Sequence, residues 1–188
     1  MVEQILKRIA KVLDDCNVPY MVIGGQAALI YGLVRNTRDI DITLGVGTEK
    51  TADMLSICEK LGLKVLSESP LKFAQDTLVL PVEDPRARIR IDFMFSFSPY
   101  EKTALKRAEP AKTGDYPVRF ASREDLIIHK IVAGRAVDME DVKGILIKCG
   151  KSFDVKYIRH WLDEFAKMPE CENLTGRFEE LLKNVGHK

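Results

Sequence analysis

The chain of 188 residues, 46% of them hydrophobic, is long enough for one substantial core with room for a small appended subdomain, and we do not expect two large independent domains. Its 29 basic and 28 acidic residues give a net charge of +1, which excludes a protein that coats nucleic acid through its overall charge. The four cysteines are widely spaced without a Cys-x-x-Cys pair, so they predict reduced thiols in a cytoplasmic protein rather than a zinc site.

The N-terminal segment, residues 2–15, predicts an amphipathic helix. Ile5, Ile9, Val12 and Leu13 recur at helical spacing, and charged residues are spread through the segment. A signal peptide needs an uninterrupted apolar block here, and no apolar run in the chain is long enough to span a bilayer. We therefore expect no membrane partner.

A short apolar strand over residues 20–23 follows and ends at two adjacent glycines, Gly24 and Gly25. A helix over 26–33 and a strand over 39–44 are expected next. Backbone amides at a glycine turn before a helix can face an anion, and the missing side chains let a phosphate approach the main chain. The simpler interpretation is a tight turn between a strand and a helix, which is the usual one for an isolated glycine pair.

The remaining segments predict a mixed core followed by helices only. After a helix over 49–62, strands are expected over 63–67, 72–82 and 88–97, then a helix over 98–109 and a strand over 116–121. Ser122 resembles an N-cap, and helices are expected over 122–135, 138–150, 154–167 and 173–185. The expected fold class is α+β: a mixed β-sheet with helices on one face over residues 1–121, and a C-terminal helical region over 122–188 packed on this core.

Three carboxylates lie on the polar faces of two predicted strands. Side chains alternate between faces along a strand, so Asp39 and Asp41 share one face of strand 39–44, opposite three apolar residues. In strand 88–97, Asp92 lies opposite the apolar face formed by Ile89, Ile91, Phe93, Phe95 and Phe97. If the two strands are neighbours, the three carboxylates converge, and such a group needs a cation. Oxygen ligands of this kind suit Mg²⁺ or Mn²⁺, which also bind substrate phosphates.

Each of these features also has an ordinary interpretation. A single Asp-x-Asp pair is common on exposed strands, and Asp92 follows Arg86, Arg88 and Arg90 on one face, where an ion pair is expected. Two known phosphate motifs fail on spacing. The glycines do not form Gly-x-Gly-x-x-Gly, and no lysine follows Gly32 as a Walker A loop requires.

In combination, the segment GGQAALIYGLVRNTRDIDI and the later IDF resemble the signature of the nucleotidyltransferase superfamily related to DNA polymerase beta. That signature is Gly-Gly or Gly-Ser, a helix, Asp-x-Asp or Asp-x-Glu on a strand, and a third carboxylate on a later strand. The pattern Arg-x-Thr-x-Asp-x-Asp and the later KIVAGRAVDMEDV most resemble the abortive-infection, AbiEii-type toxin branch and its uncharacterised bacterial relatives. By motif, the resemblance covers residues 18–142.

The resemblance implies Mg²⁺-dependent transfer of a nucleoside monophosphate from an NTP to an acceptor, with pyrophosphate leaving. It implies that Asp39 and Asp41 bind the metals, and that Asp92 completes the second metal site and helps to deprotonate the acceptor hydroxyl. Gly24 and Gly25 would hold the β- and γ-phosphates, although many members have Gly-Ser, whose serine hydroxyl contacts the phosphates. The further nucleotide-binding candidates are Arg35, Thr37, Arg38, Lys130 and Arg135.

These cations also have simpler interpretations. Arg35 and Arg38 flank the aspartates and are able to compensate their charge instead of binding phosphate. A lone lysine on a helix, such as Lys130, is usually solvated. Asp138 and Asp141 lie one helical turn apart, where they either orient the cations or act as ordinary acids near a helix N-terminus.

The sequence leaves the acceptor and the protein partners open. RNA or tRNA, a protein hydroxyl and a small molecule all fit the same core. The AbiEii-type branch implies a cognate antitoxin or a regulatory partner in a toxin–antitoxin or abortive-infection system. Two alternatives are a catalytically silent protein of this fold that binds a partner, and a metal-dependent phosphoesterase that uses the same carboxylates.

Overall fold

The computed structural model describes residues 1–34, 37–113, 115–150, 152–169, 171 and 173–186. Contacts group the chain into two compact units. The first comprises Met1–Gln26 and Asn36–Ala121, and the second comprises Ala27–Arg35 and Ser122–Lys188. One boundary therefore follows Ala121, while residues 27–35, which the sequence assigns to the core, group with the helices. The predicted division into domains over 1–121 and 122–188 stays a prediction.

A single mixed sheet forms the centre of the first unit. Within the described residues its seven strands run in the order β3-β4-β5-β2-β1-β7-β6. The strands are β1 (Tyr20–Ile23), β2 (Asp39–Leu44), β3 (Lys64–Val65), β4 (Val79–Asp84), β5 (Ile89–Phe95), β6 (Glu109–Thr113) and β7 (Tyr116–Phe120). The pairs β2–β5 and β1–β7 are parallel and the other neighbours are antiparallel. The predicted α+β class with a mixed sheet is confirmed.

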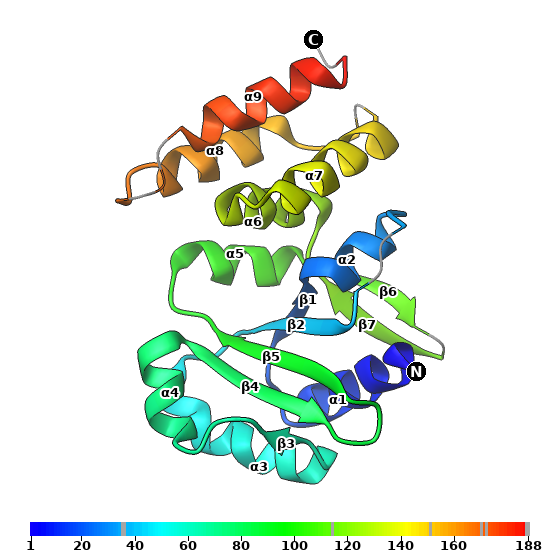
Figure 1. Ribbon diagram of the computed structural model, residues 1–188, viewed down its shortest axis with the longest axis vertical. Coiled ribbons are helices and arrows are strands. Elements are labelled where there is room, and N and C mark those ends of the chain that lie inside the picture. Colours follow the sequence, from blue (N-terminus) through cyan, green and yellow to red (C-terminus); the bar gives the residue numbers. More distant parts are fainter. Residues whose placement is uncertain (35–36, 114, 151, 170, 172, 187–188) are drawn as a thin grey trace. The chain divides into compact units, whose positions relative to one another are not determined.

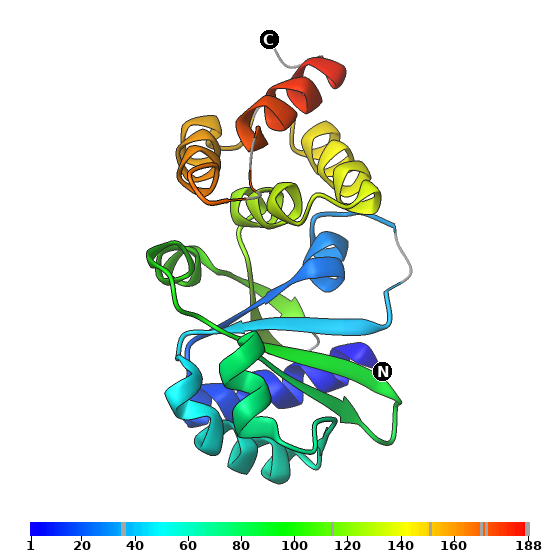
Figure 2. The same cartoon turned by 60° about the vertical axis from the view of Figure 1, so that its left-hand side comes forward.

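Helices lie on both sides of this sheet (Figures 1 and 2). In both ribbon views α1 (Val2–Asp15), α3 (Thr51–Leu61) and α4 (Pro70–Thr77) lie on one side, and α5 (Pro99–Arg107) lies on the other (Figures 1 and 2). A 3₁₀ turn, η1 (Thr48–Lys50), precedes α3, and α2 (Gly24–Ile30) follows β1 directly. Every second side chain of β5, from Ile89 to Phe95, is buried, as its alternating sequence predicts.

Three features of the structure differ from the predictions. The predicted strand over 72–82 is the helix α4 followed by β4, because Pro70 is the first residue of a helix, where it loses no hydrogen bond. Strand β6 was not predicted. Its Pro110 is tolerated because β6 pairs only with β7 at the edge of the sheet. Phe97, expected on the apolar face, is 69% exposed because β5 ends at Phe95.

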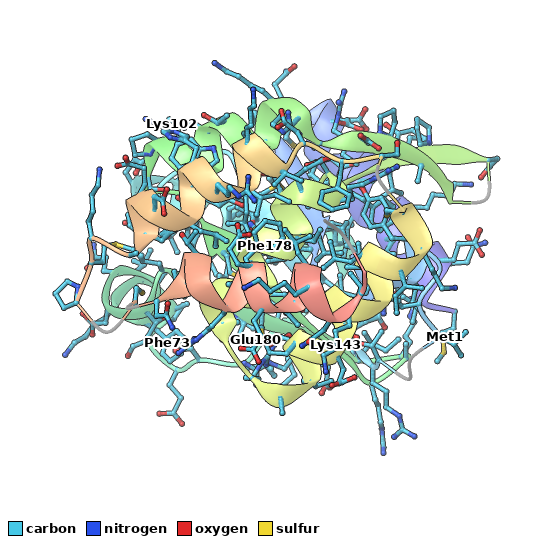
Figure 3. The ribbon with its side chains drawn as sticks, turned by 90° about the horizontal axis from the view of Figure 1, so that it is seen from above. Met1, Phe73, Lys102, Lys143, Phe178 and Glu180 are labelled. Atoms are coloured by element: carbon cyan, nitrogen blue, oxygen red, sulfur yellow. The ribbon has the colours of Figure 1, made fainter. Side chains whose placement is uncertain are left out.

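The second unit consists mainly of four helices. They are α6 (Arg123–Ala133), α7 (Ala136–Cys149), α8 (Val155–Phe165) and α9 (Leu174–Asn184). Ser122 caps α6 as predicted, since its hydroxyl accepts a hydrogen bond from the Asp125 amide at 3.1 Å. Phe178 and Glu180 project from opposite sides of α9 (Figure 3), and only Phe178 is fully buried. Lys148 of α7 donates to the carbonyl oxygen of Gly32, one contact that groups residues 27–35 with these helices.

Two further expectations from the sequence concern the state of the cysteines and segments that cross a membrane. All four cysteines are free thiols, and burial raises the pKa of the Cys58 thiol to about 12. Among the described residues, no helix combines the length and the apolar character that crossing a membrane requires.

Candidate active site

The two strands that carry the predicted carboxylates are neighbours in the sheet. Strands β2 and β5 run parallel with Asp41 directly opposite Asp92. Adjacent strands lie about 4.8 Å apart, and residues paired in register point to the same face. Asp39 lies two residues before Asp41 and therefore shares that face. The structure thus fulfils the condition on which the sequence-based site depends, that these two strands lie side by side.

The glycine turn begins beside Asp41. Strand β1 pairs with β2 so that Ile23 is opposite Asp41, and Gly24 follows immediately with a left-handed φ of +65°. A β-carbon on residue 24 would lie 3.1 Å from the Asp41 Cγ and closer still to Oδ2. Only glycine fits there, because it tolerates this φ and adds no atom against the carboxylate.

Gly25 meets a different neighbour, Thr37. A β-carbon on residue 25 would lie 2.8 Å from the Thr37 β-carbon and closer still to the Thr37 hydroxyl oxygen. The hydroxyl donates a hydrogen bond to Asp39 Oδ1 at 2.6 Å. The space beside residue 25 therefore holds the Thr37 hydroxyl, which connects the glycine turn to the first carboxylate.

Gln26 is a residue of this region that the sequence did not single out. It is almost fully buried, and its Nε2 donates to the backbone carbonyl of Asp39 at 3.2 Å. This bond fixes the start of β2 against the residues after the glycine turn. The one signal in the sequence is a polar residue at the beginning of an otherwise apolar segment, which also occurs at many helix starts.

Arg90 holds the third carboxylate. Its Nε donates to Oδ1 of Asp92 at 2.9 Å and to Oδ2 at 3.1 Å. The Arg90 side chain is 58% exposed and that of Asp92 is 22% exposed. This is the ion pair that the sequence offers as an alternative to a catalytic role for Asp92.

The donor set suits a divalent metal, although the carboxylates are not gathered around one point. Three carboxylates on one face supply the hard oxygen ligands that Mg²⁺ and Mn²⁺ prefer. Within the residues that the structure describes, no three His, Cys, Asp or Glu side chains are arranged as they are around a metal ion. Two of the three carboxylates make other contacts, since Asp39 accepts a hydrogen bond from Thr37 and Asp92 pairs with Arg90.

The remaining predicted nucleotide-binding residues fall into three groups. Arg38 is exposed and directly precedes Asp39. Arg35 lies outside the described residues. Lys130 and Arg135 belong to the second unit, where Lys130 is 3% exposed. Their predicted role in nucleotide binding stays a prediction.

In the second unit, Lys130 and Arg135 join two aspartates of α7. The Lys130 ammonium donates to Asp141 Oδ2 at 2.6 Å and to Asp138 Oδ1 at 3.3 Å. Arg135 donates to Asp138 through Nε at 2.6 Å and Nη2 at 3.2 Å. Burial by itself raises the pKa of Asp138, but the Arg135 hydrogen bond and the Lys130 charge outweigh it and lower the pKa below its ordinary value. These contacts hold the junction of α6 and α7 together.

The sequence matches the family described as nucleotidyl transferase of unknown function (DUF2204) over residues 2–175. A comparison with curated proteins gives no match. Among solved structures, the antibiotic-resistance factor ANT(2'')-Ia is similar with a TM-score of 0.58 and 18% identity, over 99% of this chain and 97% of that chain.

Two further solved structures share the fold. A nucleotidyltransferase-like antigenic protein from Paracoccidioides brasiliensis has a TM-score of 0.59 and 17% identity, over 97% of this chain and 87% of that chain. The lincosamide antibiotic adenylyltransferase LnuA, with lincomycin bound, has a TM-score of 0.54 and 15% identity, over 76% and 94%. At these identities the likeness concerns the fold, which is the nucleotidyltransferase-like fold that the sequence predicts.

Proposed function

Since the chain belongs to this nucleotidyl transferase family, we propose that it transfers a nucleoside monophosphate from an NTP to an acceptor hydroxyl, with Mg²⁺ as its cofactor and pyrophosphate leaving. The observation that carries the proposal is the register of β2 and β5, with Asp41 opposite Asp92 on the face next to Gly24. A carboxylate cluster beside a turn without side chains suits a metal-bound triphosphate.

The carboxylates have separate roles in this proposal. Asp39, Asp41 and Asp92 would hold the divalent metal, and Asp92 would also receive the proton of the acceptor hydroxyl. The metal supplies charge neutralisation at the attacking and leaving oxygens when it is bound.

The glycine turn and the cations would position the triphosphate. Gly24 and Gly25 offer backbone amides without side chains in the way, and the Thr37 hydroxyl lies next to Gly25. Arg38 is exposed beside Asp39, where a guanidinium is suited to phosphate oxygens. The proposed nucleotide-binding set is therefore Gly24, Gly25, Arg35, Thr37, Arg38, Lys130 and Arg135.

The acceptor belongs to one of three classes: RNA or tRNA, a protein, or a small molecule. ANT(2'')-Ia has been solved with adenylyl-2''-tobramycin, so this fold is found with a small-molecule product in at least one protein. A toxin–antitoxin setting with an antitoxin or regulatory partner, and a cytoplasmic location, stay predictions of the sequence.

Transfer of label tests the proposal. The chain is incubated with Mg²⁺ and each α-labelled NTP, together with total RNA, a protein lysate or a small-molecule extract. We expect label in one acceptor fraction, at least a hundredfold less with Asp41→Asn, and wild-type levels with Asp53→Asn, which removes an exposed carboxylate on α3.

Other results would replace the proposal with one of its alternatives. Release of free nucleoside monophosphate without label in any acceptor fraction supports the phosphoesterase. No transfer and no hydrolysis with any NTP, together with a stable protein partner, supports a silent protein of this fold.

A further inference from the structure

The pair formed by Arg90 and Asp92 occupies the face of the sheet on which the carboxylates lie. One nitrogen of the guanidinium, Nε, reaches both carboxylate oxygens of Asp92, at 2.9 and 3.1 Å. The two residues are separated by one residue in β5, so they point to the same face. A cation that is to bind the same oxygens must compete with this contact.

The sheet also places Arg90 between two further carboxylates. In the register of the sheet, Arg90 is opposite Asp39 on β2 and opposite Glu83 on β4. Residues paired across neighbouring strands have β-carbons roughly 5 Å apart, which is close enough for opposite charges to interact. Arg90 therefore lies among four carboxylates on the three strands β4, β5 and β2, those of Glu83, Asp92, Asp39 and Asp41.

We infer that Arg90 is a positioning residue that holds Asp92 in the metal-free protein and releases it when a divalent cation binds. The inference rests on the proposed function, because it takes Asp92 to be a metal ligand. Without a cation, three like charges on one face repel one another. The guanidinium offsets that repulsion, and its 58% exposure leaves the side chain room to move away from Asp92.

The inference predicts the effect of removing the guanidinium on metal affinity. Breaking an exposed or half-exposed ion pair of this kind changes an equilibrium constant by roughly fivefold at most. We therefore expect Arg90→Gln to bind Mn²⁺, without nucleotide, about three- to fivefold more tightly than the wild type. Arg90→Lys keeps the charge but not the planar donor group, so its affinity should lie between the two.

Direct titration with Mn²⁺, followed by the electron paramagnetic resonance of the free ion, measures this affinity in the full chain. Arg86→Gln is the matched control, because it removes an exposed arginine from the turn just before β5. Its affinity should stay within twofold of wild type. In the Asp92→Asn background, Arg90→Gln should also change the affinity by less than twofold, since the contact is already lost. Circular dichroism establishes that each variant is folded.

The outcomes separate this inference from the proposed function. If Asp92→Asn weakens Mn²⁺ binding but Arg90→Gln equals the wild type or the Arg86→Gln control, Arg90 does not hold Asp92 against the metal, and the metal site stands. If no folded variant binds Mn²⁺, the metal site and the proposed function are both overturned. Tighter binding by Arg90→Gln than by the wild type and by Arg86→Gln, with no such difference in the Asp92→Asn background, supports the inference.

Discussion

Residue 25 has no side chain, and the Thr37 hydroxyl lies where one would begin. The sequence resembles the nucleotidyltransferase superfamily, and many members of that superfamily have a serine at the position of Gly25. In this chain a serine would meet Thr37, so the two positions constrain each other. The hydroxyl is supplied by a residue just before β2 instead of by the turn, and it is bonded to Asp39.

We predict that Gly25→Ser lowers the free energy of unfolding by about 1–3 kcal/mol, because the added side chain overpacks against Thr37. Thr37→Gly in the same chain should recover most of the loss, because it removes the three Thr37 side-chain atoms that the new β-carbon meets. Urea unfolding of the single and double variants measures this coupling. Equal losses in Gly25→Ser and the double variant would show that Thr37 is not the obstacle.

Strand β5 shows how much one element contributes to both stability and the site. Phe93 lies on its covered face with 0% exposure, whereas Phe97, two residues beyond the end of the strand, is 69% exposed. We predict that Phe93→Ala costs about 3–5 kcal/mol of unfolding free energy, because it leaves a cavity. Phe97→Ala should stay within about 0.5 kcal/mol of the wild type. Urea unfolding measures the free energy of unfolding of both variants. Similar losses in Phe93→Ala and Phe97→Ala would contradict the burial of Phe93 and the exposure of Phe97.

The junction of α6 and α7 predicts a dependence of stability on pH. The pKa of Asp138 is lowered in the folded chain, through the Arg135 hydrogen bond and the Lys130 charge acting against burial. A lowered pKa adds stability that is present above the ordinary value of 3.8 and is lost as the pH falls through the lower folded value.

We therefore predict that Asp138→Asn costs roughly 3 kcal/mol at pH 5.5, because it leaves a buried lysine with one carboxylate fewer. The cost should shrink at pH 3, where the wild type has begun to lose the same interaction. Urea unfolding at the two pH values measures the difference, with Asp163→Asn on α8 as an exposed control. A cost that does not change with pH would show that Asp138 is not ionised in the folded chain.

At the scale of elements, alternation and capping residues predicted most strands and helices. The faces of Asp39, Asp41 and Asp92 follow from the period of two along a strand. The pairing of β2 with β5 does not follow from that period. Between Leu44 and Ile89 lie 44 residues, and no local pattern encodes which strands become neighbours. The helix α4 does not follow from the sequence pattern, because a proline between two apolar segments separates strands as readily as it begins a helix.

The contacts inside the site could be predicted only in part. Two adjacent glycines before a helix predicted a close approach, but not that Asp41 and Thr37 are the groups that approach them. Arg90 stood near Asp92 in the sequence, yet an arginine two residues away on a strand forms an ion pair in one structure and meets solvent in another. Register and side-chain conformation decide such contacts, and both depend on the folded sheet.

Considered as a whole molecule, the chain combines a family match over most of its length with a carboxylate cluster that the fold assembles from two strands. The contacts assign α2 to both units, since Gly24 and Gly25 belong to the first and Ala27 to Ile30 belong to the second. The proposed nucleotide-binding residues therefore come from both units. Their common role is a prediction about the nucleotide-bound protein.

The fate of the α- and γ-phosphorus of one NTP tests the central claim most directly. The full chain is given Mg²⁺, the acceptor fraction that takes up label, and an NTP labelled differently at the two positions. We predict that the α-label enters the acceptor and that the γ-label appears in pyrophosphate in equal amount, with neither event in Asp41→Asn. Transfer of the γ-label to the acceptor, or its release as inorganic phosphate without uptake of the α-label, would contradict nucleotidyl transfer by these carboxylates.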